Sequence, residues 1–125
     1  MAKQERTLYE RLGGYDAIAA IVTDYISKIR ADQQFAHYSR GRGTDKKMRD
    51  LQLNIDYMCK VTGGCNYYMG RDMKTTHAGL GINEAEWKAN MKYMAQSLDK
   101  HKVPTKEKEE VLALVEKMKP EIVEK

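Results

Sequence analysis

Three histidines and two cysteines are the side chains of this 125-residue chain best suited to hold a metal or to carry redox chemistry. The histidines are His37, His77 and His101, and no two of them lie three or four residues apart, so no pair can chelate a metal from one helix face. Cys59 and Cys65 are six residues apart, which matches none of the common zinc or redox motifs. These spacings argue against a metal site built from protein ligands alone.

A metal held mainly by an organic cofactor is compatible with these residues, because a haem macrocycle supplies four nitrogens and the protein need supply one imidazole. An isolated histidine such as His77 is more often a surface or hydrogen-bonded residue than a ligand. Three neighbouring features favour a ligand here. Met73 lies one turn earlier and can pack on the same side of a flat cofactor, glycines flank the segment, and Trp87 and Met91 follow on the next predicted helix.

Apolar residues recur at helical spacing along the whole chain, and no segment alternates as an exposed strand does. Thr7 is placed to cap a short first helix, and Asn83 with Glu86 has the pattern of a capping box. Pro120 is expected to end or kink the last helix. The sequence thus predicts an all-α protein with four main helices and one or two short ones, over residues 8–12, 15–30, 44–61, 84–100 and from 105 onward.

The length and composition predict one globular domain, residues 1–125, with a flexible N-terminal segment (1–6) and a C-terminal tail (121–125). Hydrophobic residues make up 42% of the chain and charged residues 32%, which excludes a disordered chain. No apolar run approaches the about 18 residues that a membrane span needs, and the N-terminus lacks the apolar segment of a secretory signal. We therefore expect a cytoplasmic protein without a membrane partner.

The net charge of +4 is concentrated in residues 40–50, where five basic residues face two acidic ones. A nucleic-acid-binding protein is expected to show a broad basic stripe interleaved with aromatic residues, so we expect no nucleic-acid partner. Two interpretations of the basic segment stay open: a solvated loop, or a rim that attracts a small anion such as the carboxylates of a ligand.

Several motifs occur in an order and spacing that resemble the group I truncated haemoglobins. These are LYERLGG at 8–14, the Gly63–Gly64 pair, YMGRDMK at 68–74 running into His77, and Val103–Pro104 before the last helix. The resemblance covers roughly residues 7–119. It implies a two-over-two helical sandwich that encloses haem b, with His77 as the proximal iron ligand.

The same resemblance implies which residues surround the haem. Ser39 stands where a phenylalanine usually wedges the haem, and Lys46, Lys47 or Arg49 can pair with the haem propionates. The expected cofactor-binding residues are Tyr38, Ser39, Lys46, Lys47, Leu51, Met58, Met73, Thr76, His77, Ile82, Trp87 and Met91.

On the distal side the sequence departs from the family pattern. Ile26 occupies the usual position of a ligand-binding tyrosine, Tyr25 lies one residue earlier, and Asn54 stands where a glutamine is common. Either Tyr25 and Asn54 both donate to bound oxygen, or Tyr25 is a core residue with its hydroxyl satisfied elsewhere and Asn54 donates alone. The other expected residues of the distal pocket are Asp50, Leu53 and Tyr57.

The function implied by the resemblance is reversible binding of dioxygen, nitric oxide and carbon monoxide at an open iron position, in a monomer. Nitric oxide dioxygenation, supported by an external reductase, is compatible with it. Two alternatives come from the residues themselves. One is a cofactor-free helical interaction module that uses its eight methionines as an adaptable surface, and the other is a redox sensor based on Cys59 or Cys65.

Overall fold

The computed structural model of the chain describes residues 6–35, 43–64 and 82–123. Within these ranges the structure consists of helices and turns, with no strand, which confirms the prediction of an all-α protein. The elements are α1 (Leu8–Leu12), α2 (Tyr15–Ala31), the 3₁₀ helix η1 (Gln33–Phe35), α4 (Thr44–Val61), α6 (Glu84–Lys100), α7 (Thr105–Glu116) and α8 (Lys119–Ile122). None of the helices in these ranges has an apolar stretch long enough to cross a bilayer.

Local capping sets where two of these helices begin. The Thr7 hydroxyl accepts from the Glu10 backbone N–H at 3.1 Å, and the Asn83 side chain accepts from the Glu86 backbone N–H at 2.8 Å. In both cases the glutamate carboxylate reaches back to the N-cap backbone N–H. Each side chain thus satisfies N–H groups that the helix itself leaves unpaired, and the predicted starts of α1 and α6 are confirmed.

The break in the last helix falls before Pro120 rather than at it. Helix α7 ends at Glu116, and Pro120 lies within the first two positions of α8, which begins at Lys119. A proline fits there because the N–H groups of a first helical turn have no partner inside the helix. The short α8 then places Ile122 in the core, where it is 8% exposed.

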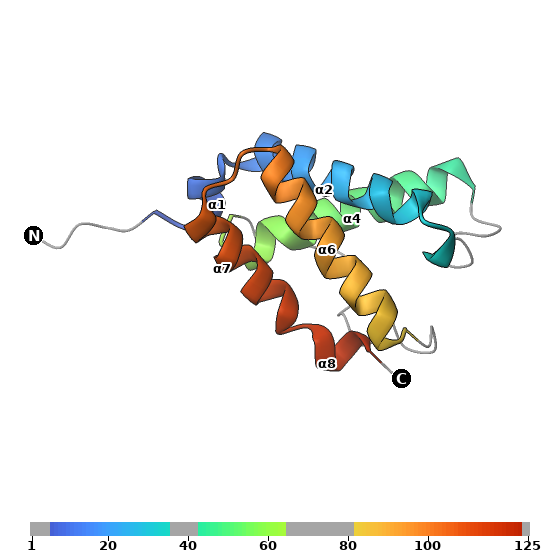
Figure 1. Cartoon of the computed structure of the whole chain (residues 1–125). Coiled ribbons are helices and arrows are strands. Elements are labelled where there is room, and N and C mark those ends of the chain that lie inside the picture. Colours follow the sequence, from blue (N-terminus) through green and yellow to red (C-terminus); the bar gives the residue numbers. More distant parts are fainter. Residues whose placement is uncertain (1–5, 36–42, 65–81, 124–125) are drawn as a thin grey trace, which may run out of the picture.

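The long helices form two pairs, one stacked on the other (Figure 1). Helix α2 packs on α4, α6 packs on α7, and contacts between α2 and α6 join the two pairs. The short α1 contacts both α2 and α7. This arrangement confirms the predicted two-over-two sandwich.

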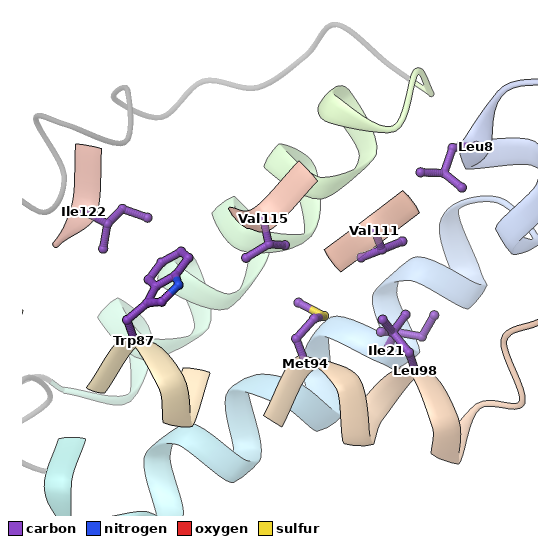
Figure 2. Close-up of a cluster of buried hydrophobic side chains, with 8 residues drawn as sticks. All are labelled: Leu8, Ile21, Trp87, Met94, Leu98, Val111, Val115 and Ile122. Carbon is purple, nitrogen blue, oxygen red and sulfur yellow. The ribbon is translucent and has the colours of Figure 1, made fainter. Parts of the chain in front are cut away.

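Two apolar clusters fill the space between these helices. The larger cluster is built from both pairs, and Figure 2 shows its Trp87 beside Val115 and Ile122 at one end. The smaller one lies between α2 and α4, and the half-buried Met58 packs against both. The buried members of the larger cluster are Leu8, Ile21, Trp87, Met94, Leu98, Val111, Val115 and Ile122, and those of the smaller one are Ile18, Val22, Ile55 and Cys59.

Polar bonds connect α2 to α6 along the contact between the pairs. The fully buried Ser97 donates its hydroxyl to Asp24 Oδ2 at 2.7 Å, and Lys100 Nζ lies 3.0 Å from Asp24 Oδ1. Further along, the Tyr93 hydroxyl donates to Asp32 Oδ2 at 2.5 Å. These bonds hold α2 and α6 in register over most of their length, and both helices carry residues of the candidate site.

Candidate functional site

Four of the predicted haem-wall residues lie around one apolar cluster. Trp87 and Met91 are one turn apart on α6, Ile82 lies just before that helix, and Met58 comes from α4. Trp87 is buried, whereas the other three are half-buried and pack against the buried cluster. The fold therefore brings together side chains that are up to 33 residues apart in the sequence.

Leu51 takes a different place. It is half-buried on α4 and packs against the smaller cluster, together with Ile26 from α2. Met58 packs against both clusters. It therefore connects Leu51 and Ile26 with the cluster that contains Trp87 and that Met91 packs against.

Two of the three predicted propionate partners lie in the first turn of α4, and the third, Arg49, is exposed in the next turn. Lys46 is exposed and Lys47 is half-buried. The Arg30 guanidinium, near the end of α2, donates to the Lys47 carbonyl at 2.8 Å and holds these two helix ends together. Ammonium groups at this position are accessible to the carboxylates of a ligand.

Tyr25 is the distal candidate whose environment is best defined. Its half-buried ring packs against the larger cluster, and its hydroxyl donates to Asn90 Oδ1 on α6. Desolvation by burial raises the pKa of the Tyr25 phenol well above its usual value, so the group is a neutral O–H donor over the physiological range. One of the two alternatives drawn from the sequence makes Tyr25 a core residue whose hydroxyl is hydrogen-bonded within the protein. The bond from Tyr25 to Asn90 is a hydrogen bond of this kind.

The other distal candidates lie along α4. Asn54 is exposed, and its amide nitrogen donates to the Asp50 carbonyl one turn earlier at 2.8 Å. An amide nitrogen carries two protons, so the second N–H of Asn54 can still donate to a ligand. Asp50, Leu53 and Tyr57 are half-buried.

Asn90 is the site residue that the sequence-based interpretation missed. It lies on α6, three residues after Trp87 and four before Met94, so it belongs to the same helix face as these two buried residues. An amide on an otherwise apolar helix face is the signal that could have found it. Its partner on α2, however, could not be inferred from spacing.

His101 is the one histidine within the described residues. It caps the C-terminus of α6, its side chain is near the surface, and Nδ1 lies 2.9 Å from the Ser97 carbonyl. Fourteen residues of helix separate it from Trp87, about 21 Å along the axis, so His101 cannot serve a cofactor against Trp87. His77, Met73, Thr76, Tyr38, Ser39 and His37 lie outside the described residues.

Within those described ranges no group of three or more histidine, cysteine or acidic side chains is placed to hold a metal ion. Cys59, one of the two candidates for redox sensing, is fully buried in the smaller cluster. Cys65 lies outside the described residues.

The residues present fit a flat apolar cofactor. Tyr25, Met58, Ile82 and Met91 all pack against the buried core and yet keep part of their surface exposed. Covering such surface with an apolar macrocycle is favourable by roughly 25 cal/mol for each Å² removed from water. The lysines at the start of α4 add positive charge suited to carboxylate groups.

Comparison with known proteins identifies the family. The family model described as bacterial-like globin matches residues 7–124. A group 1 truncated hemoglobin from Nostoc is 28% identical over 119 residues, covering 95% of this chain and 98% of the relative, and one from Mycolicibacterium paratuberculosis is 26% identical over 116 residues, covering 93% and 83%. The crystal structure of truncated hemoglobin from Tetrahymena pyriformis in the Fe(III) form superposes with a TM-score of 0.86 at 25% identity, covering 96% of this chain and all of that one.

The chain therefore belongs to the bacterial-like globin family. Its resemblance to the group I truncated haemoglobins is confirmed. Membership of this family implies haem-based binding of diatomic gases such as dioxygen, and it favours neither a cofactor-free interaction module nor a cysteine-based sensor.

Proposed function

We propose that this protein binds haem b through His77 and reversibly binds dioxygen, nitric oxide and carbon monoxide at the opposite iron position. The observation that carries the proposal is the partly exposed apolar wall of Met58, Ile82 and Met91 in a chain of globin fold. When bound, the haem supplies the iron at which a gas molecule coordinates.

The side chains of this wall exclude water from the cofactor, and their apolar contact supplies most of the affinity. Lys46 and Lys47 pair with the propionates at the rim. Exposed ion pairs of this kind contribute about 0–1 kcal/mol each, so they orient the haem more than they hold it. Removing both charges should therefore alter haem orientation with little loss of binding.

The assignment of His77 is tested by the absorbance spectrum of the purified protein. His77→Ala should lose the Soret band of bound haem, and added imidazole should restore it in His77→Gly, because the small variant leaves room for a free ligand. His101→Ala is the matched control, since it removes a histidine that lies far from the wall. A parent-like spectrum in His77→Ala would refute the assignment.

Asn54 is the proposed donor to bound dioxygen. One of its N–H groups is used by the Asp50 carbonyl, which fixes the amide plane, and the second is free to point at the ligand. Hydrogen bonds to partly charged groups contribute about 1.5–3 kcal/mol, which corresponds to ten-fold or more in a rate constant. Asn54→Ala should thus release dioxygen at least about ten times faster.

The control for Asn54 is Gln52→Ala on the same helix. The Gln52 amide is engaged by the Tyr15 hydroxyl at 2.8 Å and by Asp56 at 2.9 Å, so it has partners of its own. Stopped-flow measurement of dioxygen release should separate the two variants. Equal rates in Asn54→Ala and Gln52→Ala would exclude Asn54 as the donor.

The enzymatic extension of this proposal is nitric oxide dioxygenation. Nitric oxide, dioxygen and one electron together give nitrate, and an external reductase supplies the electron. A monomer in the cytoplasm is the state in which we expect this reaction. In the presence of a flavin reductase, the parent and His101→Ala are expected to form nitrate during turnover. His77→Ala is expected to form none.

A further inference from the structure

The Tyr25–Asn90 hydrogen bond lies within the wall proposed for the haem. Tyr25 packs against the same buried cluster as Met58, Ile82 and Met91, and Asn90 immediately precedes Met91 on α6. The bond joins residues 65 positions apart in the sequence and crosses from one helix pair to the other. A polar pair therefore stands among otherwise apolar side chains of the pocket.

The chemistry of this pair is asymmetric. A phenol has one proton to donate, and Tyr25 donates it to the Asn90 carbonyl oxygen. A hydroxyl engaged in this way can accept a hydrogen bond but cannot also donate one to a bound gas. Burial raises the pKa of Tyr25, so ionisation does not compete with this donation under physiological conditions.

We propose that Asn90 is a positioning residue that withholds the Tyr25 hydroxyl from the bound gas and thereby keeps dioxygen release fast. The inference rests on the proposed function, since it assumes that haem binds against the wall of Met58, Ile82 and Met91. It makes Asn90 a determinant of gas affinity although it does not itself touch the ligand. A change at Asn90 would then convert a pocket that hydrogen-bonds dioxygen weakly into one that hydrogen-bonds it strongly.

The physical reason is the cost of an unsatisfied buried hydroxyl. If Asn90 loses its acceptor oxygen, the Tyr25 O–H must find another acceptor or remain unpaired in a largely apolar environment. Bound dioxygen, which carries partial negative charge, is the acceptor that the pocket would then offer. Asn90→Leu keeps the approximate size of the side chain and removes the acceptor, so it directs the hydroxyl toward the ligand.

The test is a double-mutant cycle on dioxygen release, after haem content is verified for each variant from its absorbance spectrum. Asn90→Leu should slow release by about ten-fold or more. Without the Tyr25 hydroxyl there is no donor to redirect, so adding Asn90→Leu to Tyr25→Phe should leave the release rate of the Tyr25→Phe variant unchanged. Asn90→Ala is the second variant if the leucine does not fold.

A second readout does not depend on gas binding. Urea unfolding followed by far-UV circular dichroism should show that Tyr25→Phe and Asn90→Leu are non-additive by roughly five-fold in the unfolding equilibrium constant, as expected for a lost mutual hydrogen bond. Tyr93→Phe is the matched control, because it also removes a tyrosine bond between α2 and α6, at Asp32, and should change neither the coupling nor the release rate.

Three results would overturn the inference. Faster release in Tyr25→Phe would show that the hydroxyl already serves the ligand. An equal effect of Asn90→Leu on the release rate with and without the Tyr25 hydroxyl would show that Asn90 acts by another route. If Asn90→Leu changed the release rate in neither background, Asn90 would have no role in gas affinity. Failure of the proposed function is distinguishable, since the parent itself would then contain no haem.

Discussion

The Asp24 carboxylate has three side-chain partners, and replacing Asp24 by asparagine tests what its charge contributes to stability. Its carboxylate accepts from the buried Ser97 hydroxyl, lies 3.0 Å from Lys100 and 3.4 Å from Lys28, and its side chain is 14% exposed. Asparagine keeps an oxygen that Ser97 can donate to, so Asp24→Asn removes the charge without leaving the serine unpaired. The variant therefore reports on electrostatics rather than on packing.

The expected loss of unfolding free energy follows from the pKa of the Asp24 carboxyl. Hydrogen bonds from Ser97 and Lys100 lower the pKa of Asp24 from 3.8 to about 2. Each pKa unit corresponds to about 1.4 kcal/mol, and solvent screening of the exposed Lys100 reduces the total, so we expect Asp24→Asn to lose about 1–2 kcal/mol of unfolding free energy at pH 7.

The sign of the pH dependence is fixed by the direction of this shift. Because the folded-state pKa lies below the unfolded-state value, the stabilisation by Asp24 is present above pH 3.8 and is lost as the pH falls toward 2. The difference in unfolding free energy between the parent and Asp24→Asn should therefore shrink as the pH falls from 3.8 toward 2. Other carboxylates titrate in both proteins alike, so the difference isolates Asp24.

Urea unfolding followed by circular dichroism at several pH values measures this difference. Asp99→Asn is the matched control: it makes the same change in charge at a residue that is 62% exposed and pairs with Lys108 alone among the ion pairs described. We expect it to lose no more than about 0.5 kcal/mol. Equal losses in the two variants, or a loss in Asp24→Asn that persists undiminished at pH 2, would refute the reasoning.

Two further predictions concern packing. Leu98→Ala, at a core residue that is 1% exposed, should lower the unfolding free energy by about 2–5 kcal/mol, whereas Met48→Ala, at 64% exposure, should change it by no more than about 0.5 kcal/mol in the same urea experiment. Gly64→Ala would place a methyl group 2.1 Å from the Tyr9 ring and should cost about 1–3 kcal/mol, while Gly43→Ala meets no atom within 4 Å. Similar unfolding free energies within either pair would contradict the packing described.

The contacts between α2 and α6 connect these predictions to the site. Asp24 on α2 and Asp32 at its C-terminal cap bond to Ser97 and Tyr93 on α6, and Tyr25 on α2 bonds to Asn90, nearer the start of α6. All three bonds cross from one helix pair to the other, but only the Tyr25–Asn90 bond involves a side chain packed against the proposed haem wall. Loss of the Asp24–Ser97 or the Asp32–Tyr93 bond should therefore alter stability without altering gas binding.

The helices could be predicted from the sequence because the signals that define them are local. The apolar repeat of 3.6 residues marks their inner faces, and Thr7 with Glu10 and Asn83 with Glu86 supply caps within a single turn. Gly63, with a φ of +95°, adopts the left-handed conformation just after α4, which a glycine does without steric cost. The motifs from position 8 onward likewise sufficed to indicate the family.

What only the tertiary structure decided is which polar groups meet across the helices. Tyr25 could be placed near the pocket from its position in the chain, but its use of Asn90 depends on the crossing of α2 and α6, and the same is true of Ser97 and Asp24. Helical spacing states which face of a helix a residue occupies, not which residue of another helix it faces. The sequence by itself therefore determined the helices, the family and His77 as the proposed ligand, whereas the packing of one helix pair on the other decided where the Tyr25 hydroxyl donates.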